Sequence, residues 1–161
     1  MIEEKIKWNE KYKTLSKKHP SKLLYFIPSA KEKQKALDIA GGLGQNSSVL
    51  LKKGYDVTLI DISDVAISKI NNPQITKICL DVDNYIIPQN EYDVIIMIKY
   101  FNLDILKQIP TALKNGGYFV FETIKKYPIS KEKFFEIFKN FEVIYFSENP
   151  FRFVGKYEIR N

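Results

Sequence analysis

The stretch Leu37-Asp38-Ile39-Ala40-Gly41-Gly42-Leu43-Gly44 decides the fold of this 161-residue chain. Its first residues have the apolar pattern of a short buried strand, and the glycines that follow form a tight turn into a helix that we expect from Gln45. In open α/β sheets, ligands bind at the carboxyl ends of the strands, where the first N–H groups of a helix also point. The stretch therefore predicts a ligand site, although nucleotide, flavin and sulfonium binders and purely structural turns share this pattern.

Composition is that of an ordinary globular protein, with 45% hydrophobic and 27% charged residues. We expect one domain over residues 1–161, with a helical arm at 1–30 and a core at 36–161. No apolar run approaches the roughly 20 residues of a membrane span, and the first residues lack a secretory pattern. A single cysteine, Cys79, excludes an internal disulfide and, with His19 as the one histidine, a Cys/His zinc site. We therefore expect a cytoplasmic protein without a metal or a membrane partner.

The net charge of +6 lies entirely in residues 1–35, where ten lysines face four acids. Such an arm suits an anionic partner such as nucleic acid, but a solvated lysine-rich helix face gives the same pattern. Because the arm has no arginine, it lacks the fork that bidentate phosphate recognition uses. A nucleic-acid partner is possible but not favoured.

Apolar strands alternate with helices along the chain, which predicts a doubly wound parallel sheet. The arm should hold an amphipathic helix over 3–18, ended by His19-Pro20, and a short helix over 21–26. The expected strands are 36–40, 56–61, 75–80, 92–98, 118–122, 141–147 and 153–159. The expected core helices are 45–53, 63–70, 103–113, ended by Asn115-Gly116-Gly117, and 130–140. A parallel crossover needs about a dozen residues, so the last two strands must form an antiparallel hairpin.

Acidic residues stand at the ends of the next two strands. Asp61 ends the second strand and suits the two hydroxyls of a ribose. Asp81 follows the third strand and suits an exocyclic amine such as adenine N6, with Ile62 and Val82 on either side of the ring. Each acid alone could be a solvated loop residue, but three features at three successive strand tips favour one ligand site.

Asp38 lies inside the first strand, where a carboxylate is costly unless it is satisfied. Backbone amides of the turn and the ammonium of a bound amino-acid moiety would satisfy it. A nicotinamide cofactor has no ammonium, so Asp38 favours a ligand with an amino-acid end. The alternative is a carboxylate held by turn amides alone.

These motifs resemble those of the class I S-adenosylmethionine-dependent methyltransferases over nearly the whole chain. The run 37–46 resembles motif I, 55–63 resembles motif II, 80–85 followed by 92–96 resembles the adenine loop and fourth strand, and 113–118 is similar to the L-x-P-G-G turn. Within the class, Trp8-Asn9-Glu10-Lys11-Tyr12 and Phe121-Glu122-Thr123 resemble the tellurite-resistance and thiopurine methyltransferase-like group. The chain departs from the pattern at Lys11, where an arginine is usual, and in its short segment 123–129.

The resemblance implies a Rossmann-like three-layer sandwich with a seven-stranded, mostly parallel sheet of order 3-2-1-4-5-7-6, whose last strand is antiparallel. It also implies S-adenosyl-L-methionine as the cofactor. The methionine end would be held by Asp38 and the turn 40–44 and oriented by Asn46, and Tyr12 would close over the cofactor. The implied cofactor-binding residues are Tyr12, Asp38, Ala40, Gly41, Gly42, Gly44, Asn46, Asp61, Ile62, Ser63, Asp81 and Val82.

On the acceptor side, Lys99, Tyr100 and Phe101 follow the fourth strand. Lys99 could hold an anionic acceptor and Tyr100 could orient one, or the two aromatic residues could simply belong to the core. No strong general base is apparent, because His19 has the setting of a surface loop.

We expect methyl transfer to a small-molecule acceptor by in-line displacement, in a monomer or a weak homodimer. One alternative is an RNA or protein methyltransferase that docks its substrate on the lysine arm. Another is a non-catalytic module that binds S-adenosylmethionine. A nicotinamide-dependent reductase is disfavoured by Asp38 and by the C-terminal hairpin.

Overall fold

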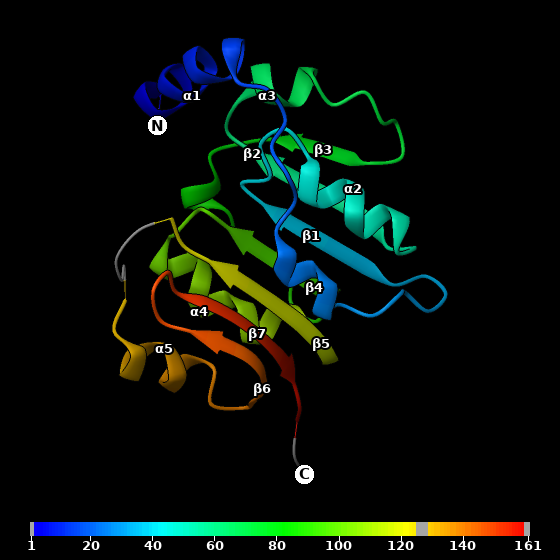
Figure 1. Ribbon diagram of the computed structural model, residues 1–161, viewed down its shortest axis with the longest axis vertical. Coiled ribbons are helices and arrows are strands. Elements are labelled where there is room, and N and C mark those ends of the chain that lie inside the picture. Colours follow the sequence, from blue (N-terminus) through cyan, green and yellow to red (C-terminus); the bar gives the residue numbers. More distant parts are fainter. Residues whose placement is uncertain (1, 125–128, 160–161) are drawn as a thin grey trace.

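Seven strands form a single sheet in the order β3-β2-β1-β4-β5-β7-β6 (Figure 1). The computed structural model describes residues 2–124 and 129–159. Strands β1, β2, β3, β4 and β5 pair in parallel, whereas β7 pairs antiparallel with both β5 and β6. The predicted fold, strand order and terminal hairpin are thus confirmed. The strands are β1 (Lys35–Ile39), β2 (Asp56–Asp61), β3 (Thr76–Cys79), β4 (Tyr92–Ile98), β5 (Leu113–Glu122), β6 (Phe141–Ser147) and β7 (Arg152–Tyr157).

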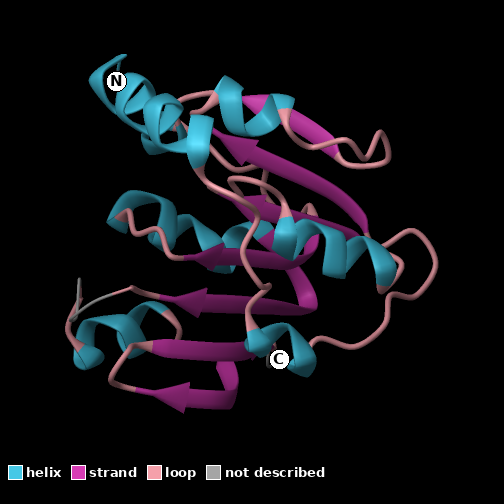
Figure 2. Cartoon of the chain, turned by 45° about the horizontal axis from the view of Figure 1, so that its top comes forward, coloured by secondary structure: helices cyan, strands magenta, loops and turns pink. Residues whose placement is uncertain are grey.

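Helices cover both faces of the sheet and give the molecule three layers (Figures 1 and 2). Because side chains alternate along a strand, Leu37 and Ile39 of β1 join the core beneath α4 and α5, whereas Ala36 joins the core beneath α2 and η1. None of the helices in the described ranges is long and apolar enough to span a bilayer. The helices are α1 (Ile2–Thr14), α2 (Gln45–Lys52), α3 (Asp64–Ser68), α4 (Leu103–Ala112) and α5 (Lys131–Ile137), with 3₁₀ turns η1 (Lys22–Phe26) and η2 (Val82–Asn84).

Two predicted boundaries are wrong by four residues or more, and the others differ by three residues or fewer. The first helix ends at Thr14 rather than at residue 18, and the chain beyond it runs in an extended path to η1 (Figure 2). Residues of this connection line a cavity, so its course is set by the site rather than by helical pattern. Strand β5 begins at Leu113, which pairs with Tyr92 of β4, so the Asn115-Gly116-Gly117 turn lies within the strand rather than before it. Of the short segment 123–129, residues 125–128 lie outside the described residues.

The core beneath α4 and α5 is dominated by phenylalanine. The Phe134 ring of α5 lies 4.6 Å from that of Phe138, 4.8 Å from Phe151 and 4.9 Å from Phe153, measured between centroids. Phe151 and Phe153 belong to the C-terminal hairpin region, so this cluster fixes the hairpin against α5. It thereby sets where the first residue of β7 lies beside the tip of β5.

We expect Phe134→Ala to lower the free energy of unfolding by about 3–5 kcal/mol, because it removes a buried ring and leaves a cavity among its neighbours. Urea unfolding followed by circular dichroism measures this. The exposed neighbour Lys133 supplies the matched control, Lys133→Ala, which should change stability by less than about 0.5 kcal/mol. Equal effects from the two variants would show that the cluster does not hold the hairpin.

Candidate active site

The glycine-rich turn after β1 has a left-handed backbone at Ala40, Gly42 and Gly44, with φ of 55°, 59° and 80°. The Gly42 N–H donates to Asp61 Oδ2 at 2.9 Å, which ties the turn to the tip of β2. A Cβ atom at Gly42 would lie 2.5 Å from the Tyr12 hydroxyl oxygen. Glycine is therefore required at residue 42 both by the backbone conformation and by the close approach of Tyr12.

Asp61 is 5% exposed, and its carboxylate is bound by backbone N–H groups on two sides. Besides Gly42, the Ser63 N–H donates to Asp61 Oδ1 at 2.9 Å. Burial raises the pKa of Asp61, while the Ser63 and Gly42 N–H groups act in the opposite direction because they stabilise the charged form. The carboxylate is thus fixed in orientation at the edge of the turn.

Asp38 is 1% exposed and lies beneath Gly41, where an added Cβ would come within 2.7 Å of its Oδ2. The Ser47 hydroxyl of α2 donates to the same oxygen at 2.7 Å. Burial raises the pKa of Asp38 to about 7; the Ser47 bond lowers it and the charge of Asp61 raises it. Because the two buried carboxylates disfavour each other's negative charge, this part of the site favours a positively charged ligand.

The N-terminal helix α1 is held against α3 by polar contacts. The Ser63 hydroxyl donates to Asn9 Oδ1 at 2.6 Å, and Asn9 Nδ2 donates to Asp64 Oδ1 at 2.9 Å. The Lys69 ammonium donates to the Tyr12 carbonyl. These contacts place the Tyr12 ring over the turn, where burial and the carboxylates of Asp61 and Asp38 raise its pKa to about 12.

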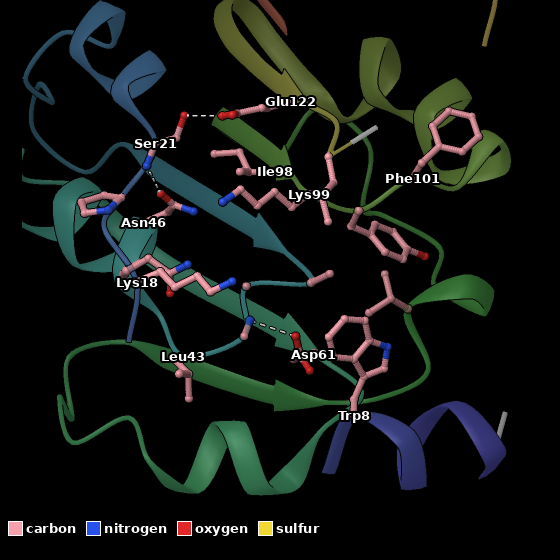
Figure 3. A pocket seen from close by; sticks show the side chains of 18 of the residues that line it. Trp8, Lys18, Ser21, Leu43, Asn46, Asp61, Ile98, Lys99, Phe101 and Glu122 are labelled. Atoms are coloured by element: carbon pink, nitrogen blue, oxygen red, sulfur yellow. Dashed lines mark hydrogen bonds between the residues drawn. The ribbon is translucent and has the colours of Figure 1, made fainter. Parts of the chain in front are cut away.

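A cavity of about 970 Å³ lies between the arm and the tips of the strands (Figure 3). Most of the residues predicted for the site line it, including all three acceptor-side candidates. Asp38, Gly44 and Ser63 do not line it. The predicted residues along its wall are Tyr12, Ala40, Gly41, Gly42, Asn46, Asp61, Ile62, Asp81, Val82, Lys99, Tyr100 and Phe101.

Tyr100 points its hydroxyl at η2 rather than at open space. The hydroxyl donates to Asp83 Oδ1, and Asn102 Nδ2 donates to the same oxygen at 3.2 Å. Burial, the bond to Asp83 and the charges of Asp83 and Asp81 hold the pKa of Tyr100 far above its usual value. In this arrangement Tyr100 steadies the loop that carries Asp81.

Further residues line the cavity that the sequence did not predict for the site. The Ser21 hydroxyl donates to Glu122 Oε1 at 2.7 Å, and the Ser21 N–H donates to Asn46 Oδ1 at 2.8 Å (Figure 3). Arg152 Nε donates to Glu122 Oε2 at 3.3 Å. The lining residues not predicted for the site include Trp8, Lys18, His19, Ser21, Glu122, Tyr145 and Arg152.

Sequence signals existed for some of these residues. Trp8 and Glu122 fall within the two quoted motifs at residues 8–12 and 121–123, which could have marked them. Arg152 carries no local signal, because it reaches the site only through the antiparallel pairing that sets it opposite Glu122. His19 is exposed, as expected of a loop residue, yet it stands in the cavity wall.

A family model described as a methyltransferase domain matches residues 10–148. The chain belongs to this methyltransferase domain family. The family and the fold indicate S-adenosylmethionine as the cofactor. A comparison with curated proteins found no match. In the part of the methyltransferase that the structure describes, no group of three or more His, Cys, Asp or Glu residues could hold a metal ion.

Solved structures share the methyltransferase fold at low identity. The Haloferax volcanii methyltransferase in complex with the Trm112 methyltransferase activator has a TM-score of 0.75 at 15% identity, over 99% of this chain and 98% of that chain. TehB from Haemophilus influenzae has a TM-score of 0.66 at 19% identity, over 84% and 60%. A Haemonchus contortus phosphoethanolamine N-methyltransferase, solved with S-adenosylhomocysteine, has a TM-score of 0.62 at 20% identity; the match covers 76% of this chain but 37% of that longer one.

The geometry of the turn fits this cofactor. S-adenosylmethionine carries positive charge on its sulfonium and its ammonium, which suits the buried pair of Asp38 and Asp61. The side-chain-free surface at Gly41 and Gly42 allows a ligand to approach the backbone closely.

We expect Gly42→Ala to destabilise the methyltransferase, because the new Cβ meets the Tyr12 hydroxyl and sits on a left-handed backbone that costs about 1–2 kcal/mol. Tyr12→Phe removes the oxygen in the clash and should restore part of the loss in the double variant. Urea unfolding of the four proteins in the cycle gives the coupling energy between the two positions. Strictly additive effects would mean that Tyr12 does not lie over Gly42.

The raised pKa of Asp38 predicts a pH dependence of stability. The folded chain holds the Asp38 proton up to about pH 7, whereas the unfolded chain releases it near 3.8. The resulting stabilisation is fully present below about pH 3.8 and is lost progressively as the pH rises to about 7. In ligand-free protein, Asp38→Asn should therefore gain stability relative to the wild type as the pH rises from about 4 to about 7. A constant difference in unfolding free energy across that range would contradict the assignment.

Proposed function

We propose that the chain transfers the methyl group of S-adenosylmethionine to a small-molecule acceptor. The observation that carries the proposal is one cavity that joins the acids at the tips of β2 and β3 to the side chains at the tips of β4 and β5 beneath the arm. The acids suit the ribose and the adenine amine of the cofactor, and the wall at the tips of β4 and β5 remains for an acceptor. The likeness to TehB and the motifs at 8–12 and 121–123 support a place near the tellurite-resistance and thiopurine methyltransferase-like group.

In this proposal Asp61 accepts from the ribose hydroxyls, and Asp81 reads the adenine amine between Ile62 and Val82. The turn and Asn46 receive the methionine end. Asp38, Gly44 and Ser63 act indirectly, because none of them lines the cavity. The left-handed Gly44 shapes the turn, and the Ser63 N–H fixes the Asp61 carboxylate. The negative charge of Asp38 beneath Gly41 favours an ammonium group of the ligand above it.

The cofactor supplies a methyl group that is already activated by the sulfonium. The chain then needs to align the two reactants and exclude water, which together account for much of the catalysis of a displacement. Residues 15–21 serve the second purpose, because Leu15, Ser16 and Lys18 line the cavity and Ser21 closes its end through Asn46 and Glu122.

The placement of the arm also favours a small acceptor over RNA or protein. If the lysine arm served to dock a macromolecule, it would be expected to stand free of the cavity. Instead α1 is bound to α3 through Asn9, and Ser21 is bound to both α2 and β5. The arm therefore narrows access to the cavity that a macromolecular substrate would have to enter.

Calorimetry with S-adenosylhomocysteine and with NADH tests the cofactor half of the proposal. We expect binding of the first and none of the second. Asp61→Ala should lower the affinity for S-adenosylhomocysteine at least about tenfold, because a hydrogen bond to a charged group contributes about 1.5–3 kcal/mol. A loss of less than about twofold would contradict the ribose role of Asp61.

An analogue without the two ribose hydroxyls is the matched control. It should bind the wild type more weakly than S-adenosylhomocysteine, and Asp61→Ala should weaken it by a smaller factor than it weakens S-adenosylhomocysteine, because only the effect on the turn remains. Release of S-adenosylhomocysteine during turnover, measured with small thiols, oxyanions and RNA in parallel, then tests the acceptor. Transfer to RNA alone would overturn the small-molecule assignment.

A further inference from the structure

The charged residues of the cavity are separated into two walls. Asp61, Asp81 and Asp83 stand at the ends of β2 and β3 and in η2, on the wall that we assign to the cofactor. The opposite wall, formed by β4, β5, β7 and the end of the arm, carries cations instead. Its charged members within the described residues are Lys22, Lys99, Glu122 and Arg152, whereas Lys18 lines the cavity beside Asn46 (Figure 3).

The acid on this second wall does not balance the cations. Glu122 accepts from Ser21 and from Arg152 Nε, and its side chain is only 12% exposed. The bond to Arg152 engages one of the five N–H groups of the guanidinium. Positive charge therefore predominates on the wall, and an arginine fork stands within it.

Lys99 is held in an unusual conformation at the point where β4 ends. Its φ is 60°, in the left-handed region that a lysine rarely adopts, and its N–H donates to the Glu122 carbonyl at 2.7 Å. Figure 3 shows the ammonium groups of Lys99 and Lys18 both directed into the cavity. Backbone strain of this kind persists where the surrounding structure imposes it, and it concentrates at functional sites.

Aromatic side chains accompany these cations. Phe26 stacks on Tyr145 with centroids 5.4 Å apart, and both line the cavity, as does Phe101. An acceptor that lies along this wall would meet flat apolar surface next to positive charge.

We propose that the acceptor is a small organic oxyanion, a carboxylate or a phosphate monoester on an apolar body, whose charge Lys99 binds. Arg152 and Lys22 add positive potential around it, and the Phe26–Tyr145 stack receives the apolar body. This inference rests on the proposed methyl transfer and names the chemical class of its substrate.

The experiment is a calorimetric titration of the protein saturated with S-adenosylhomocysteine. The probes are benzoate, phenyl phosphate, neutral benzamide and cationic benzylamine, which share one ring. We expect benzoate or phenyl phosphate to bind more tightly than benzamide and benzylamine, and the two anions together distinguish a carboxylate from a phosphate site. Lys99→Met should weaken binding of the preferred anion by about tenfold or more, while leaving benzamide unchanged.

Two further variants serve as controls for the effect of Lys99→Met. Lys99→Arg keeps the charge and should retain most of the affinity for the anion. Lys107→Met removes an exposed lysine of α4 that does not line the cavity, and it should bind every probe as the wild type does. Thermal unfolding of each variant checks that the fold is kept.

Equal affinity for the four probes, or no binding of either anion, would overturn the proposal. It would also fail if Lys99→Met weakened S-adenosylhomocysteine and left the anion unaffected, because Lys99 would then serve the cofactor. Failure of the wild type to bind S-adenosylhomocysteine is seen before any probe is added. That result would overturn the proposed function itself and is thereby distinguished from failure of this inference.

Discussion

The hydrogen bond from the Gly42 N–H to the Asp61 carboxylate joins the tips of two parallel strands, and the arrangement of the site follows from it. The bond requires a left-handed turn, which glycine provides at residue 42, and a buried carboxylate at the end of β2. With the turn drawn toward β2, Gly41 lies directly over Asp38, and Gly42 lies against Tyr12. A side chain at either glycine would separate groups whose proximity gives the site its preference for a positively charged ligand.

The first part of the arm, helix α1, depends on that turn but contributes little to the core. Helix α1 has no buried residue and is held by Asn9 and by the bond from Lys69 to the Tyr12 carbonyl. Segments with few buried apolar contacts open at low free energy. In contrast, Leu23 and Leu24 of η1 are buried in the core beside α2, so the far end of the arm is fixed. A segment that is fixed in the core at one end and held by polar contacts at the other can act as a cover that opens to admit ligands.

Sequence reasoning succeeded where local pattern decides structure. The bounds of β2, β4 and β6 agree with those predicted, because each is an apolar run between turn-forming residues. It failed where tertiary contacts decide, as at Leu113, which joins β5 by pairing with Tyr92. The same distinction between local pattern and tertiary contact holds for the residues of the cavity. Asp61, Asp81 and Lys99 line it as predicted, since each ends or follows its own strand. Arg152 was missed because no neighbouring residue in the sequence reveals its position.

The position of Arg152 shows what the antiparallel hairpin adds to this fold. In a sheet with all strands parallel, the first residue of every strand lies at the edge opposite the ligand site, and only last residues reach it. Strand β7 runs the other way, so its first residue, Arg152, pairs with Glu122, the last residue of β5. The hairpin thus brings a guanidinium to the end of the sheet where parallel strands place only the residues at their carboxyl ends. The reversal that separates this sheet from dinucleotide-binding domains is therefore also the source of a cation on the acceptor wall of the cavity.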